Sequence, residues 1–192
     1  MNRRQSIAVI VVVLAMVFSL LYACKRAFHL FKTYPDGYLD GKRQLVELLV
    51  EAIIPETDTP GARSAGVATF VIDKVKQFLT KNEATGFYMG LEEVDALGVK
   101  KFGKSFSVCS LEQREQVLTV METREWERGS LPFRIKRKLF GRSFIDILKT
   151  FTVEGYCTSK SGCVDGLAYD PVPVHYVPCI DLKPGQHSWA TK

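Results

Sequence analysis

Apolar residues recur at helical spacing through most of the chain after residue 40. In the first stretch Leu45, Leu48, Leu49, Ala52 and Ile53 fall at positions that share one helix face. Four later stretches repeat the pattern: Val67, Phe70, Val71, Val75, Phe78 and Leu79; Phe87, Leu91 and Val94; Val117, Leu118 and Met121; and Phe144, Ile147, Leu148 and Phe151. No stretch sustains period-two alternation. The pattern predicts an all-α fold, in which about five helices pack as a single domain over residues 41–192.

The residues between the first two stripes predict where these helices end and begin. Pro55 cannot continue a helix without losing a backbone hydrogen bond, so the first helix should end at or before Ile54. Thr59 followed by Pro60 is typical of an N-cap and a first helical residue. We therefore expect a short polar loop and a second helix that starts there.

Later boundaries carry similar signals. The third helix should end near Gly103, and Ser110 with Gln113 forms a capping-box pattern that opens the fourth helix. A turn at Gly141 should precede the fifth helix, and Gly155 is well placed to end it.

The chain changes character from about residue 156 onward. Four prolines and several glycines follow, which excludes a long helix and predicts an extended C-terminal tail. Tyr156, Tyr169, Tyr176 and Trp189 lie in this tail and are the kind of side chain that protein interfaces favour. They are candidate partner anchors, and the alternative is a tail that wraps around its own domain.

Residues 1–26 form a predicted membrane or export leader. Residues 7–24 are uncharged and mostly apolar, and Arg3 and Arg4 precede them. A run of about 18 such residues can just span a bilayer, while shorter runs suit signal peptides. Three alternatives remain: an uncleaved signal anchor, a twin-arginine leader, or a lipoprotein leader in which Cys24 is lipidated. Each places the soluble domain outside the cytoplasm, after a connector at residues 27–40.

Four cysteines follow the leader, and they allow three pairings. Cys157 and Cys163 are close enough to bridge a small loop, so we predict a disulfide between them; two unrelated thiols are the alternative. Cys179 is left for Cys109, for a partner's thiol or for neither. The net charge of +5 is too small to indicate nucleic acid as a partner.

The sequence predicts no catalytic, cofactor or metal site in this chain. Glu56 and Asp58 are paired carboxylates, but their spacing next to a proline-ended helix is equally what a capped turn needs. The three histidines are scattered. The G-x-G-x-x-G motif of dinucleotide folds and the C-x-x-C-H motif of covalent haem are both absent from the sequence.

Several motifs together resemble one known family. The opening string runs from Ile53 to Ala62 and is followed by Ala65-Gly66-Val67; Phe102-Gly103 lies in the middle; and the closing segment holds Gly155-Tyr156, Thr158-Ser159, Tyr169-Asp170-Pro171-Val172-Pro173 and Cys179. Their order and spacing resemble the gluconate 2-dehydrogenase subunit 3 family. The closing segment adds Asp170, Pro171, Pro173 and Cys179 to the candidate partner-binding residues.

This resemblance implies a non-catalytic small subunit of a membrane-bound flavoprotein dehydrogenase. The expected partners are a large FAD-dependent subunit of the glucose-methanol-choline type and a multihaem cytochrome c subunit, which would carry the FAD and the haem c. The expected location is the bacterial inner membrane, with the soluble domain in the periplasm. A stand-alone membrane-tethered assembly or binding factor is the alternative, and a hydrolase using Glu56 and Asp58 is a third possibility.

Overall fold

The computed structural model describes residues 12–19, 34–35, 37–126, 141–168, 179 and 181–189. The chain divides into two compact units, Met1–Pro35 and Asp36–Lys192. Residues 12–19 are helical and exposed, while the rest of the predicted leader, including Cys24, lies outside the described residues. In the part of the chain that the structure describes, no helix is both long enough and apolar enough to cross a membrane.

The second unit begins with α2 (Tyr38–Gly41) and α3 (Arg43–Ile53). The Tyr38 ring lies 5.3 Å from the Tyr88 ring, centroid to centroid, so this aromatic residue of the predicted connector packs on the domain. The α3 helix ends at Ile53, as predicted, because Pro55 follows and has no N–H to donate.

The α4 helix (Val67–Phe78) begins later than predicted. Thr59 and Pro60 do not open it, because the Thr59 backbone is bonded within the loop: its carbonyl oxygen accepts from the Thr57 N–H at 3.1 Å. Residues 62–66 form turns instead. Gly66 then takes a left-handed conformation, with φ of 71°, directly before Val67.

The α5 helix (Lys81–Phe102) is the longest helix of the described residues. Thr80 and Glu83 form a capping box at its start, which was not among the predicted helix boundaries. Gly103 ends it in the left-handed conformation with φ of 67°, as predicted.

A 3₁₀ turn, η1 (Phe106–Val108), connects α5 to α6 (Leu111–Trp126). The predicted capping box is present at the start of α6. The Ser110 N–H donates to Gln113 Oε1 at 3.1 Å, and the Gln113 N–H donates to Ser110 Oγ at 3.4 Å.

The prediction that Gly155 ends the last helix is wrong. The α8 helix (Phe144–Thr158) runs through Gly155 and is followed by one turn of π-helix, η2 (Gly162–Gly166). Gly155 lies where α8 crosses α4, and a Cβ atom there would approach Phe70 Cδ1 to 2.7 Å and Val67 Cγ1 to 3.0 Å. Its lack of a side chain therefore permits close helix packing and does not terminate the helix.

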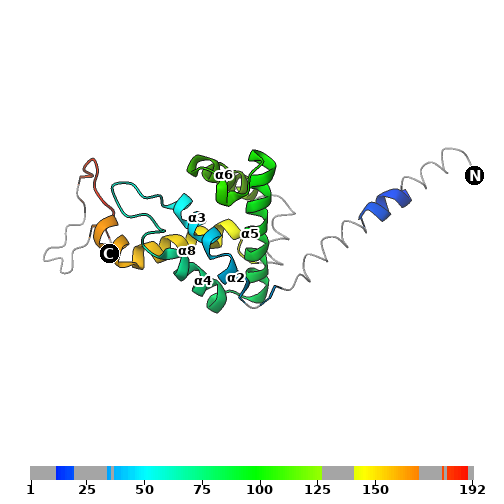
Figure 1. Ribbon diagram of the computed structural model, residues 1–192, viewed down its shortest axis with the longest axis horizontal. Coiled ribbons are helices and arrows are strands. Elements are labelled where there is room, and N and C mark those ends of the chain that lie inside the picture. The colour runs from blue at the N-terminus through cyan, green and yellow to red at the C-terminus, as the bar shows by residue number, and fades with distance from the viewer. Residues whose placement is uncertain are drawn as a thin grey trace, which may run out of the picture. The chain divides into compact units, whose positions relative to one another are not determined.

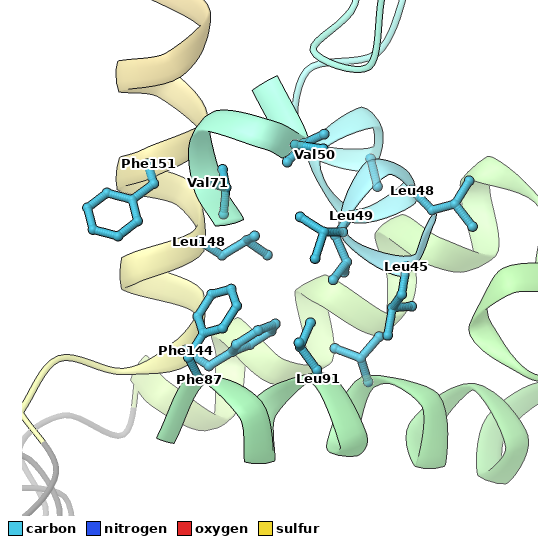
Figure 2. Packing of buried hydrophobic residues seen from close by; sticks show 14 of the residues in the cluster. Leu45, Leu48, Leu49, Val50, Val71, Phe87, Leu91, Phe144, Leu148 and Phe151 are labelled. Atoms are coloured by element: carbon cyan, nitrogen blue, oxygen red, sulfur yellow. The ribbon is translucent and has the colours of Figure 1, made fainter. Parts of the chain in front are cut away.

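The five long helices enclose one hydrophobic core, which confirms the predicted all-α fold. The α4 helix packs against both α3 and α8, and α5 packs against α6 and α8. The Phe87 and Phe144 rings lie 5.0 Å apart, and Figure 2 shows them facing each other between α5 and α8. The described residues contain no strand beyond an isolated bridge between Ala168 and Trp189.

Candidate partner-binding site at the loop after α3 and the C-terminal segment

The loop between α3 and α4 has a closed base. The Ala62 N–H donates to the Ile54 carbonyl oxygen at 2.9 Å, so the residues between them form a closed turn of the chain. In Figure 1 this loop extends toward the C-terminal end of α8.

The Glu51 side chain holds both sides of this loop. Its Oε1 accepts from the Glu56 N–H at 2.9 Å, and its Oε2 accepts from the Arg63 N–H at 3.0 Å. A carboxylate that accepts two backbone N–H groups is a strong local restraint. Glu51 was not among the predicted site residues, since nothing local in the sequence identifies a side chain that bonds amides 5 and 12 residues away.

Gly61 completes the arrangement. A Cβ atom at this position would lie 2.8 Å and 2.9 Å from the two Glu51 carboxylate oxygens and 2.7 Å from the Glu56 nitrogen. The glycine of the opening motif is therefore required because the Glu51 carboxylate occupies the space where its side chain would be.

The tip of the loop is polar and exposed. The Thr57 hydroxyl donates to Asp58 Oδ1 at 2.9 Å. This bond, together with the Asp58 backbone N–H and the nearby His187, holds the pKa of the Asp58 carboxyl below its ordinary value. A solvent-exposed carboxylate with a lowered pKa is a weak proton acceptor near neutral pH. The arrangement thus supports the turn interpretation of Glu56 and Asp58.

Tyr156 connects the loop to α8. Its hydroxyl donates to the Pro60 carbonyl oxygen at 2.8 Å, and the residue is only 7% exposed. The prediction that Tyr156 lies in an extended tail and anchors a partner is therefore wrong. The α8 helix continues to Thr158, so Tyr156 is a buried helical residue that fixes the loop from inside.

The chain after α8 turns back around the same tyrosine. The Ser159 hydroxyl donates to the Tyr156 carbonyl oxygen at 2.8 Å and accepts from the Gly162 N–H at 3.0 Å. Gly166 lies so close to the Tyr156 hydroxyl that a Cβ atom there would overlap it. The glycines of η2 therefore allow the chain to pass against Tyr156.

The last described segment lies next to this turn. The Ala168 N–H donates to the Ser188 carbonyl oxygen at 2.8 Å, and His187 Nδ1 lies 3.2 Å from the Gly166 carbonyl oxygen. His187 is also close enough to the loop to affect Asp58 electrostatically. The structure thus brings the opening motif together with the first part of the closing motif, at Tyr156, although nothing local in the sequence showed that they meet. We call Ile54–Ala62 and residues 181–189 the loop–tail surface.

The predicted partner anchors other than Tyr156 divide into two groups. Cys179 and Trp189 are exposed, and 53% of Trp189 is accessible to solvent. The remaining anchors lie outside the described residues: Tyr169, Asp170, Pro171, Pro173 and Tyr176.

The predicted bridge between Cys157 and Cys163 is not formed, and both residues are free thiols. Cys157 lies in the last turn of α8, while Cys163 lies in the following π turn. This turn directs the Cys163 Sγ to the Cys157 carbonyl oxygen, to which it donates at 2.8 Å. The side chain therefore bonds to the backbone of its expected partner.

Within the described ranges, no group of three or more His, Cys, Asp or Glu side chains is placed to hold a metal ion. The loop of the loop–tail surface is held by hydrogen bonds from Glu51, Tyr156 and its own backbone.

The fold and this site define a small all-α domain that presents an ordered loop beside its C-terminal segment. Residues 40–174 match the family described as Gluconate 2-dehydrogenase subunit 3, and the chain belongs to this family. The match confirms the resemblance inferred from the motifs and covers the loop, Tyr156 and η2. Comparisons with the curated proteins and with the solved structures found no match.

Proposed function

We propose that this chain is the non-catalytic small subunit of a membrane-bound, flavin-dependent dehydrogenase that oxidises gluconate or a related sugar or polyol. The family match carries the proposal, because a subunit 3 works in association with other subunits of a complex. The FAD and the haem c belong to partners: a large flavoprotein of the glucose-methanol-choline type and a multihaem cytochrome c. The small subunit supports the folding, export or stability of the flavoprotein.

The loop–tail surface is the proposed contact with the flavoprotein. Its loop is held in one conformation by Glu51 and Tyr156, so little conformational entropy is lost when a partner binds it. Trp189 adds an exposed aromatic side chain of the type that dominates binding energy at interfaces. Cys179 and the predicted anchors between residues 169 and 176 are further proposed contacts with the flavoprotein.

The proposed location is the periplasmic side of a bacterial inner membrane. The uncharged run at residues 7–24 and the arginines before it support export of the domain. Mass spectrometry of the N-terminal peptide distinguishes the three leader types. An anchor retains Met1, a lipoprotein begins at acylated Cys24, and a cleaved leader leaves neither.

Purification of the tagged chain from detergent-solubilised membranes tests the subunit assignment. A flavin spectrum, dye reduction by gluconate or related substrates, and a large flavoprotein in the eluate are the expected results. A colourless single chain purified from well-preserved membranes would refute the assignment and favour a stand-alone tethered factor. The Trp189→Ala variant should recover several-fold less flavoprotein. Phe78→Ala, which removes an exposed ring from α4, should recover the normal amount.

A further inference from the structure

The turn from α5 into α6 exposes apolar side chains at a second site. Val99 is 52% exposed, Val108 is 69% exposed and Leu111 is 41% exposed. All three belong to residues 99–111, which we call the lysine corner; this corner lies at the upper end of α5 in Figure 1. Exposed apolar side chains gathered in one short segment indicate a surface that meets something less polar than water.

The charged residues of the lysine corner all have the same sign. Lys100, Lys101 and Lys104 are exposed, and residues 99–111 contain no aspartate or glutamate. Glu112 follows directly in the first turn of α6. Asp95 approaches from α5, but its carboxylate is engaged in accepting the Phe106 N–H at 2.9 Å. The corner therefore combines positive charge with aliphatic side chains.

The lysine corner is also held in a fixed conformation. The Arg114 side chain donates from Nε to the Phe106 carbonyl oxygen at 3.3 Å and from an Nη to the Ser107 carbonyl oxygen at 3.0 Å. A Cβ atom at Gly98 would lie 3.1 Å from the Phe106 nitrogen, so η1 packs directly on α5. The guanidinium group adds a further positive charge at the base of the corner.

We propose that the lysine corner rests on the surface of an anionic lipid bilayer. The lysines would meet lipid phosphates, and Val99, Val108 and Leu111 would enter the headgroup region. An acidic protein surface is less suitable, because protein interfaces are depleted in lysine and depend on aromatic and arginine anchors. Each lysine near an anionic surface raises the partition coefficient from water onto the bilayer roughly fivefold, so the three lysines together raise it on the order of a hundredfold.

The test uses the full chain reconstituted from detergent into vesicles of phosphatidylcholine, alone or mixed with phosphatidylglycerol. A Val108→Trp variant reports on the corner, and a Val153→Trp variant at a 50% exposed valine of α8 is the matched control. Brominated acyl chains quench tryptophans that enter the bilayer. We expect quenching at position 108 beyond that of the native tryptophans, only in anionic vesicles, and no added quenching at position 153.

A charge series completes the test. Quenching of the tryptophan at position 108 should be lost when Lys100, Lys101 and Lys104 are replaced by glutamine. It should also be lost at high salt, which screens the lysine charges. The Lys76/Lys81/Lys160→Gln variant changes the net charge equally at three exposed lysines outside both surfaces and should retain the quenching. Hydrogen exchange of residues 99–111 in the native chain, compared between the two vesicle types, provides a measurement without a new tryptophan.

Three results would overturn the proposal. The first is the absence of quenching and of amide protection in anionic vesicles. The second is equal quenching in neutral vesicles, which would remove the role of the lysines. The third is protection of the corner only in the purified complex, which would assign it to a protein interface.

Discussion

Glu51 provides the sharpest test of how the loop after α3 is held. The Glu51→Ala variant removes both acceptors that bind the Glu56 and Arg63 amides, without introducing a new clash. Each hydrogen bond contributes about 1 kcal/mol net, so the free energy of unfolding should fall by about 2 kcal/mol. For a chain of this size the expected decrease in Tm is about 4–8 °C.

The structure offers a close control on the same helix. Glu47 also faces the Arg63 region, but its Oε2 makes only a 3.7 Å ion pair with an exposed guanidinium group. Glu47→Ala should therefore cost less than about 0.5 kcal/mol. Both variants gain the same helix propensity from alanine, so the difference between them isolates the backbone bonds.

Thermal unfolding followed by circular dichroism measures the stability difference. Amide hydrogen exchange tests whether Glu51 holds the two backbone amides. Protection of the Glu56 and Arg63 amides should fall in Glu51→Ala and persist in Glu47→Ala. Unchanged exchange at these two amides would refute the assigned role of Glu51. Equal stability losses in the two variants would refute the estimate of its magnitude.

Three further predictions follow from single contacts. Gly155→Ala should lower the free energy of unfolding by about 1–3 kcal/mol, because its Cβ would lie 2.7 Å from an aromatic carbon of α4; an unchanged Tm would contradict this. Tyr156→Phe retains the ring but leaves the Pro60 carbonyl oxygen without its donor. The free energy of unfolding, measured by thermal unfolding, should fall by about 1–2 kcal/mol. An unchanged value would show that water replaces the hydroxyl. Burial opposes ionisation of Glu83, but hydrogen bonds from Thr80 and Arg142 outweigh it and lower the pKa below 4.5. Ionised Glu83 therefore stabilises the fold above pH 4.5, and this stabilisation is lost as the pH falls through the lower folded pKa. In the Glu83→Gln variant the free energy of unfolding should therefore fall less steeply with decreasing pH in this range.

The helices could be predicted from the sequence because their signals are local. The apolar stripes identified most of the buried side chains of the five long helices, and the Ser110–Gln113 box and Gly103 marked real boundaries. Phe78 of the second stripe is the exception, because 65% of it is exposed at the end of α4. Thr59 and Pro60 do not start the predicted helix, because the Thr59 carbonyl oxygen already accepts a hydrogen bond within the loop. A local cap pattern does not reveal whether its donor and acceptor already have other partners.

The candidate site could be predicted only in part, since its contacts are long-range. Tyr156 and Pro60 are separated by 96 positions, and no spacing rule connects them. The family resemblance identified both motifs and their order, but not that one closes on the other. Gly155 shows the same limit: its role depends on Phe70, which lies on a different helix.

The neighbouring residues Gly155 and Tyr156 explain why the closing motif belongs with the opening one. Gly155 lets α8 lie close against α4, and this close packing brings the next residue within reach of the loop. Tyr156 then donates to Pro60, while Glu51 holds the loop from the α3 side. The motif residues therefore position one loop from two sides, with the helix crossing at Gly155 and the Tyr156 hydroxyl on one side and the Glu51 carboxylate on the other.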